Sequence, residues 1–138
     1  MGDFINEKIL EILKENSRIT INELSKKINL SAPATRERVN KLEDQDIIDG
    51  YTIDINYKKL GYDIEVIVEI IIKNNLYDDF KKYINTLDNV DFCYRVSGDA
   101  CYIFKVRFED MEKVESFIDD IQPYGHTKTN FIFSKIKE

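Results

Sequence analysis

The hydrophobic residues of this chain follow two different periods, and the change between them falls near residue 47. Before that point they recur at helical spacing, as Ile5, Ile9 and Ile12 do. Beyond it, runs of β-branched residues such as 64–73 alternate with short helical stretches. A chain of 138 residues has room for two small domains. We therefore expect an α+β protein with a helical first half and a mixed second half.

Composition places the chain among globular proteins and argues against several functions. Hydrophobic residues make up 43%, and no apolar run reaches the ~18 residues of a membrane span. The first residues carry acids where an export signal needs cations, so we expect a cytoplasmic protein. Two cysteines and one histidine offer no familiar metal-ligand spacing. Without a nucleophile–base set or a phosphate-binding glycine loop, we expect no enzyme, cofactor or metal.

Cap signals divide the first half into short helices. Thr20 and Glu23 form a capping box at the start of one helix. Asn29, which tolerates a left-handed backbone, ends that helix. Ser31 is the next N-cap, and Pro33 is acceptable in a first turn because the amides there lack helical partners. These signals predict a helix, a turn of about three residues and another helix.

Cations gather on the second and third helices of this half, although the chain is acidic overall. The net charge is −6, but residues 24–42 hold five basic side chains against one acid, a net +4. Phosphate binding needs such a surface because neutralising charges release counterions. With the apolar side of the third helix turned inward, Arg36 and Asn40 face outward, and both can hydrogen-bond base edges in a major groove. The alternative is an ordinary solvated helix in a bundle.

We therefore predict a helix-turn-helix domain that binds double-stranded DNA. The third helix would enter the major groove, and free amides near Ser31 would hold a phosphate. The predicted DNA-contacting residues are Lys26, Lys27, Ser31, Pro33, Ala34, Arg36, Arg38, Asn40 and Lys41.

The second half predicts the order β-α-β-β-α-β of a ferredoxin-like sheet. The expected elements are strand 64–73, helix 76–87, strands 90–97 and 100–108, helix 111–121 and strand 127–136. If Gly98 and Asp99 form a two-residue hairpin turn, residue 96 pairs with 101, and Cys93 faces Phe104 instead of Cys101.

Both faces of this hairpin carry apolar residues, but two helices can cover only one face of the sheet. The other face therefore needs a further layer, and a second copy of the chain is the simplest source. We expect a dimer or a higher homo-oligomer. The alternative is that the N-terminal helices fold back over that face.

Residues 51–62 join the halves. Gly50 and Gly61 mark turns, and Tyr51, Ile53 and Ile55 alternate like a short strand. We therefore expect a helix-turn-helix domain at 1–50, a hinge strand or linker at 51–62 and a βαββαβ domain at 63–138.

Motifs in both halves resemble the Lrp/AsnC family, the feast/famine transcription regulators. The matching motifs are LS at 30–31, ERV at 37–39, KLE at 41–43, I-x-GY at 48–51, KLGY at 59–62 and the stretch RVSGDACYIFKV. The resemblance implies a winged-helix-like DNA-binding domain, a hinge strand and an effector-binding βαββαβ domain of the RAM/ACT-like kind. It also implies dimers, often assembled into tetramers or octamers, that bind paired DNA half-sites and respond to amino acids at a cleft between dimers.

Two features depart from the family pattern. Asp46 stands where the family usually has Gly, and Asp can adopt the left-handed conformation at some cost. The loop that usually reads Gly-x-x-Asp has a thiol in place of the acid that helps to hold the ligand's ammonium. The Thr-x-Thr of the last strand, which lines the same cleft, is present. The implied effector-binding residues are Gly98, Asp99, Ala100, Cys101, Thr127 and Thr129.

The leading interpretation is a sequence-preferring transcriptional regulator, with an amino-acid pocket that is either retained with altered selectivity or lost. One alternative is an architectural protein that wraps DNA with little sequence specificity, which the missing acid favours. The other is a metabolite-sensing module that acts on a protein partner, for which Arg36→Ala would leave activity intact.

Overall fold

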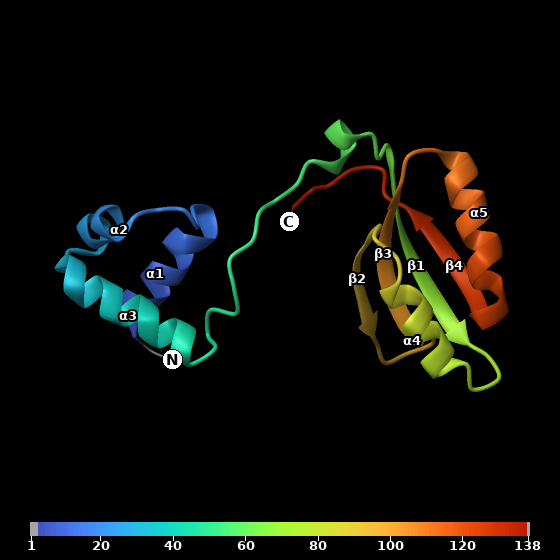
Figure 1. Cartoon of the computed structure of the whole chain (residues 1–138), viewed down its shortest axis with the longest axis horizontal. Helices are drawn as coiled ribbons and strands as arrows, with labels where there is room; N and C mark the ends of the chain where they lie inside the picture. The colour runs from blue at the N-terminus through green and yellow to red at the C-terminus, as the bar shows by residue number, and fades with distance from the viewer. Residues whose placement is uncertain (1–2, 138) are drawn as a thin grey trace. The chain divides into compact units, whose positions relative to one another are not determined.

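The computed structural model describes residues 3–137 and divides the chain into two compact units. The first unit runs to Asp54 and the second begins at Ile55. No helix within 3–137 is long and apolar enough to cross a membrane. The first unit contains the predicted helices, α1 (Phe4–Glu15), α2 (Ile21–Ile28) and α3 (Ala32–Asp44) (Figure 1).

The cap residues act largely as the sequence predicts. The hydroxyl of Thr20 accepts the amide of Glu23 at 3.1 Å, but the Glu23 carboxylate accepts from that hydroxyl instead of reaching the Thr20 amide. Asn29 is left-handed, with φ 57° and ψ 43°. Ser31 accepts the amide of Ala34 at 3.2 Å. These local bonds end α2 and start α3 within a turn of three residues.

A small apolar core joins the three helices. Its buried members are Ile9, Leu24, Ile28, Val39 and Leu42. Thr35 is also fully buried, and its hydroxyl donates to the carbonyl oxygen of Ser31 at 2.9 Å, so no polar group is left without a partner there. The inward side of α3 is therefore fixed, and its opposite side is left to solvent.

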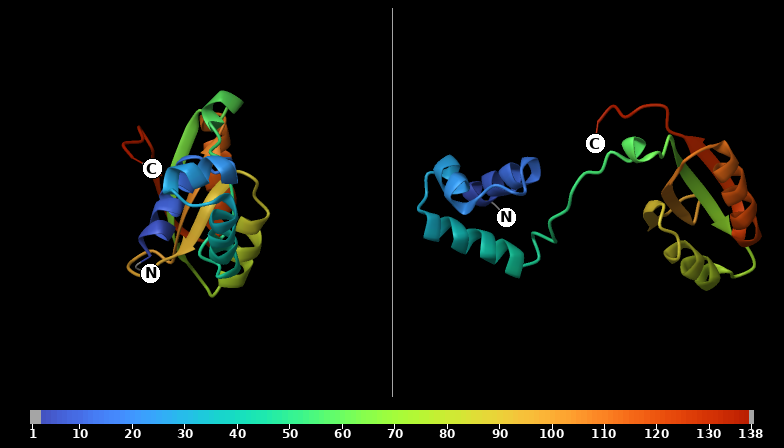
Figure 2. Two further views of the ribbon diagram at one scale, coloured as in Figure 1. Left: turned by 90° about the vertical axis from the view of Figure 1, so that its left-hand side faces the viewer. Right: turned by 45° about the horizontal axis from the view of Figure 1, so that its top comes forward.

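The chain leaves α3 through a left-handed residue, as predicted. Asp46 has φ 58°, and the amides of Ile47 and Ile48 both donate to the carbonyl oxygen of Leu42 at 3.0 Å. Residues 49–56 have no regular secondary structure (Figure 2). The short strand predicted around 51–55 is therefore wrong for the single chain. A strand needs a neighbour for its backbone groups, and no strand of the described chain pairs with this segment.

The second unit confirms the βαββαβ order. It begins with the 3-10 helix η1 (Tyr57–Leu60) and continues through β1 (Ile64–Ile72), α4 (Tyr77–Asn85), β2 (Val90–Arg95), β3 (Tyr102–Phe108), α5 (Met111–Ile121), η2 (Gln122–Tyr124) and β4 (Gly125–Phe131). The antiparallel sheet has the order β2-β3-β1-β4. The last strand ends at Phe131 and not at the predicted 136.

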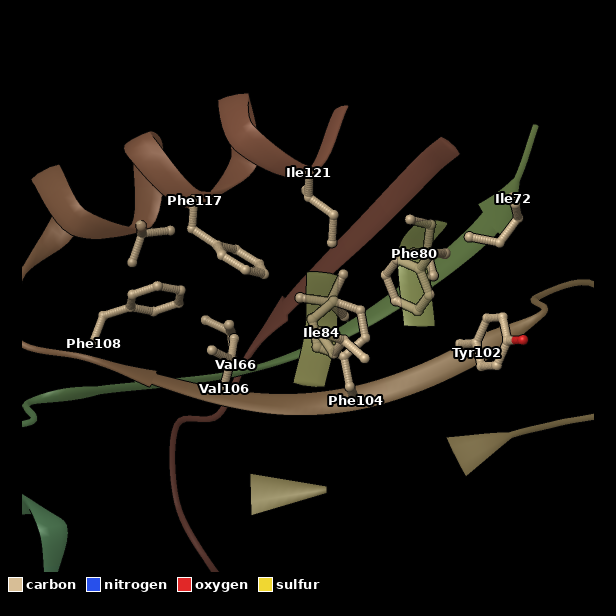
Figure 3. Close-up of a cluster of buried hydrophobic side chains, with 13 residues drawn as sticks. Val66, Ile72, Phe80, Ile84, Tyr102, Phe104, Val106, Phe108, Phe117 and Ile121 are labelled. Atoms are coloured by element: carbon tan, nitrogen blue, oxygen red, sulfur yellow. The ribbon is translucent and has the colours of Figure 1, made fainter. Parts of the chain in front are cut away.

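Both long helices cover the same face of this sheet (Figure 1). In Figure 3, Phe117 and Ile121 of α5 point toward the side chains of the sheet. Phe80 of α4 packs against Tyr102 and Phe104, with ring centroids 5.1 and 6.0 Å apart. Alternate residues of β1 and β3 are buried here, as the strand period requires.

The β2–β3 hairpin has the predicted register. Cys93 pairs with Phe104, and the amide of Val96 donates to the carbonyl oxygen of Cys101 at 3.0 Å. The register shifts between Val90 and Phe92, which the sequence did not predict. This β-bulge lets Val90 and Cys93 both pack against the helix-covered core.

The other face of the sheet, here called the open face, is less apolar than expected. It carries the predicted Phe92, Tyr94 and Ile103, together with Ile67 and Ile71 of β1. Charged side chains lie among them in a connected series, Lys135–Glu65–Lys105–Asp91–Arg107. The sequence pattern missed this because period-2 alternation assigns a residue to a face without showing that opposite charges meet across strands.

Candidate DNA-binding helix and effector loop

The outward side of α3 presents polar and cationic groups on one surface. A shallow hollow is lined there by Ala32, Pro33, Arg36, Glu37, Asn40, Lys41 and Asp44. Arg36 and Asn40 are exposed, and neither side chain makes a hydrogen bond or ion pair within residues 3–137. Lys41 lies 3.5 Å from Glu37, but both side chains are about two-thirds exposed (67% and 69%), so the pair is weak and easily exchanged. This surface brings together four predicted DNA contacts: Pro33, Arg36, Asn40 and Lys41.

Arg38, another predicted DNA contact, is engaged within the protein. Its Nη1 donates to the Asp3 carboxylate at 2.8 Å and to the Asn6 side-chain oxygen at 3.1 Å. The hydrogen bond from Arg38, together with backbone amides, lowers the pKa of Asp3. Arg38 therefore ties α3 to the start of α1, and any contact with DNA would require it to exchange partners.

The helix start offers fewer free amides than the sequence predicts. Ser31 takes the amide of Ala34, the amide of Thr35 donates to the Ser31 carbonyl, and Pro33 has none. In the described chain this leaves the amides of Ser31 and Ala32 without a hydrogen-bond partner, so the set of free amides near Ser31 is reduced to two. Phosphate binding at this helix start would depend mainly on side chains.

Lys26 and Lys27 lie in the last turn of α2, just before the turn that leads to α3. Both are exposed, and neither side chain has a hydrogen bond or ion pair within the described residues. They add two cations close to the start of α3. A cation in the last turn of a helix also interacts favourably with the negative end of the helix dipole.

The predicted effector residues lie at one end of the sheet. Gly98 has a left-handed φ of 102° at the hairpin tip that also holds Asp99 and Ala100. The amide of Cys101 donates to the carbonyl oxygen of Ile70 at 2.9 Å, and Thr127 pairs with Ile70 from the other side. The structure therefore brings Cys101 and Thr127 to either side of one residue of β1. Thr129 lies two residues further along β4, opposite Val68.

The sequence missed two residues beside this loop. The interaction with Cys101 raises the pKa of the Tyr77 hydroxyl, while Arg95 acts in the opposite direction. Tyr77 starts α4 and Arg95 ends β2, so these groups come from separate elements. No local spacing links them, and only the tertiary pairing of α4 with the hairpin brings them together.

The domain models agree with this division of the chain. Residues 65–138 match the Lrp/AsnC ligand binding domain, and residues 5–49 match a winged helix-turn-helix DNA-binding domain. The chain belongs to the Lrp/AsnC family. Like its curated relatives, it is a helix-turn-helix transcriptional regulator and therefore not an enzyme.

Two of these relatives come from Bacillus subtilis. LrpC is 48% identical over 97% of this chain and 93% of its own, and LrpA is 38% identical over 98% and 100%. The structure of B. subtilis LrpC has a TM-score of 0.95 and 47% identity, over 99% of this chain and 98% of that one. The feast or famine regulatory protein of M. tuberculosis, solved in complex with L-methionine, has a TM-score of 0.90 and 25% identity, over 100% and 96%.

Proposed function

We propose that this regulator acts in the cytoplasm by binding paired DNA half-sites through α3, as a dimer or higher homo-oligomer. The observation that carries the proposal is the outward side of α3, where Arg36 and Asn40 have no partners within the described chain. The opposite side is fixed in the core by Val39 and Leu42. An α-helix presented in this way fits a major groove.

The position of each residue would decide whether it contacts a base or a phosphate. Arg36 and Asn40, on the outward side of α3, would contact base edges. Lys26 and Lys27 would contact phosphates, which add affinity without sequence preference. Lys41 would leave Glu37 for a phosphate, because an exposed ion pair costs little to break.

A gel-shift titration on the regulator's own promoter fragment tests this division. A lost base contact costs ~1–3 kcal/mol, so Arg36→Ala should weaken binding roughly 5- to 150-fold. Lys41→Ala should weaken binding to promoter and random DNA alike. Arg95→Ala, in the second unit, is the matched control and should bind as wild type does. Wild-type binding by both α3 variants would refute the proposal.

We propose that the open face of the sheet forms the interface between two copies. Both long helices cover the other face, and half-exposed apolar residues such as Ile71 and Tyr94 remain on this one. Sedimentation should give a dimer or larger species for the wild type and a smaller species for Tyr94→Glu. Met111→Glu, at an exposed apolar residue of α5 on the helix-covered side of the sheet, serves as the control. An unchanged mass for Tyr94→Glu would exclude this interface.

An amino-acid effector would bind near the hairpin tip, between Cys101 and the Thr127–Thr129 stretch. The bound L-methionine of the M. tuberculosis relative supports this class of ligand. The thiol of Cys101 cannot pair with an ammonium as a carboxylate does, so we expect altered selectivity. Oligomer mass, measured with and without each amino acid, should change for one or a few of them. Thr127→Val should abolish that response without changing the mass in the absence of ligand.

DNA wrapping with little sequence preference is a second candidate function, favoured by the same thiol at Cys101. Binding to a promoter fragment and to random DNA of equal length separates the candidates when it is compared across salt concentrations. A ratio of affinities near one at every salt concentration would support wrapping. A ratio well above one would support specific regulation.

A further inference from the structure

A cluster that the sequence analysis did not single out joins the linker to the sheet. Arg107 lies on the open face of β3, and only 8% of it is exposed. One guanidinium nitrogen is paired with Asp91 of β2, and another donates to the carbonyl oxygen of Asp88 at 2.8 Å. The guanidinium carbon lies 3.7 Å from the ring centroid of Tyr57 and 5.1 Å from that of Tyr62. Tyr57 is the first residue of η1 and Tyr62 follows its end, so this cation holds the end of the linker on the sheet.

The β-bulge supplies the partners of Arg107. The register shift between Val90 and Phe92 leaves Asp91 as the extra residue of β2. Just before it, Asn89 accepts the amide of Arg107 at 2.9 Å and donates its side-chain amide to the Arg107 carbonyl at 3.0 Å. Bulges commonly redirect side chains in this way. The backbone and the head group of Arg107 are thus both held by one irregular segment.

The third nitrogen of this guanidinium lacks an acceptor. The Nε atom of Arg107 is buried and makes no hydrogen bond within the described chain. A buried donor without an acceptor costs free energy, which hydration would recover if the segment around η1 lifted away. The attraction between the cation and the Tyr57 ring acts in the opposite direction. The arrangement in which η1 lies against Arg107 is therefore favoured, but by only a small difference in free energy.

We propose that Arg107, Tyr57 and Tyr62 form a latch that sets the free length of the linker and so limits the spacing of the half-sites that the protein can bridge. The proposal rests on the DNA-binding function proposed above. With the latch closed, residues 49–56 are the free linker, and with the latch open it extends to residue 63. At ~3.4 Å per residue, the maximum reach grows from about 27 Å to about 50 Å.

Limited trypsin digestion tests the latch without DNA. Lys58 and Lys59, within η1, are the only basic residues from 49 to 63, so cleavage there is identified by fragment mass. Cleavage needs an extended segment, and opening of the latch supplies one. Arg107→Ala and Tyr57→Leu should each raise the initial cleavage rate about tenfold.

Matched variants separate the latch from general destabilisation. Tyr57→Phe keeps the ring face that the guanidinium contacts, so it should be cleaved as slowly as wild type. Arg95→Ala, at an exposed arginine of β2, should also leave the rate unchanged. Equal rates for wild type, Tyr57→Leu and Arg107→Ala would overturn the latch, as would a Tyr57→Phe rate as high as that of Tyr57→Leu.

The positioning role is tested with paired half-sites whose spacing is changed by half a helical turn. Wild type should discriminate against the shifted spacing, and Tyr57→Leu should lose most of that discrimination while its affinity for one half-site stays the same. Increased cleavage with an unchanged spacing preference would overturn the positioning role. If wild type binds neither site, the DNA-binding proposal fails and the positioning role fails with it, while cleavage still decides whether the latch exists.

Discussion

Arg38 and Asp3, which lie 35 positions apart in the sequence, meet at 2.8 Å and join the third helix to the first. Both side chains are partly exposed, so this pair is a modest contributor to stability. Its main effect is geometric, because it fixes the direction of α3 relative to α1. A residue chosen from the sequence as a DNA contact thus has a structural role in the free protein.

The pair predicts a pH dependence of stability. Arg38 lowers the pKa of Asp3 in the folded protein below its ordinary 3.8. The stabilisation that the Arg38–Asp3 pair gives to the folded protein is therefore complete above pH 3.8, and it is lost as the pH falls through the folded-state pKa of Asp3. Asp3→Asn should lower the midpoint of urea unfolding at pH 7, followed by helical circular dichroism, and the difference from wild type should shrink toward pH 3. Glu7→Gln, in the same helical turn, is the control and should show a smaller difference at pH 7.

The N-cap of α3 gives a second prediction. Loss of the Ser31 hydroxyl leaves the amide of Ala34 without its side-chain acceptor. Ser31→Ala should therefore reduce the free energy of unfolding by about 1 kcal/mol, as typical cap deletions do. Ser17→Ala, at an exposed serine outside the helices, should change it by less than about 0.5 kcal/mol. Equal effects of the two substitutions in urea titrations would contradict the role of the cap.

Two glycines should respond differently to the same substitution. A Cβ at Gly125 would overlap the carbonyl oxygen of Ile71, whereas one at Gly50 would meet nothing within 4 Å. Gly125→Ala forces backbone to move at the end of the pairing between β1 and β4, so it should destabilise by about 1–3 kcal/mol. Gly50→Ala should be neutral or slightly stabilising. Thermal unfolding of the two variants beside wild type checks both statements.

The partly buried thiol of Cys93 gives a fourth prediction. Burial raises the pKa of Cys93 above its ordinary 9.0. In a Cys101→Ser background, alkylation of the one remaining cysteine should be slow at pH 7 and should rise about tenfold per pH unit until beyond pH 9. A plateau below pH 8 would show that this thiol is more exposed than the structure indicates.

Features set by local signals were predictable from the sequence. Thr20, Asn29 and Ser31 mark helix boundaries through bonds to their own neighbours, and the Gly98–Asp99 turn fixes the register that places Cys93 opposite Phe104. Features that depend on distant partners were not predictable. The pairing of Arg38 with Asp3 is one example, and the meeting of Arg107 with the linker tyrosines is another.

The prediction of a strand around residues 51–55 was wrong for a related reason. Its alternation of Tyr51, Ile53 and Ile55 is a real strand pattern, but a pattern cannot supply the second strand that its backbone needs. The β-bulge at Asp91 was missed because strict alternation is assumed whenever a strand is read from sequence. Among the candidate site residues on α3, Arg36, Asn40 and Lys41 could be placed on the outward side because helical periodicity alone decides it, whereas the engagement of Arg38 with Asp3 could not be predicted.

The short free linker also has a thermodynamic consequence. A flexible chain of the length of residues 49–56 has a root-mean-square span of about 16 Å. In a dimer, once one DNA-binding unit occupies its half-site, the tether confines the other to a small volume, which corresponds to a local concentration of about millimolar. Weak single contacts would then combine into tight overall binding through avidity. Each substitution on α3 would be present in both DNA-binding units of the dimer, so its effect on the binding free energy would enter the overall affinity twice. Modest changes in α3 would therefore produce large changes in promoter occupancy.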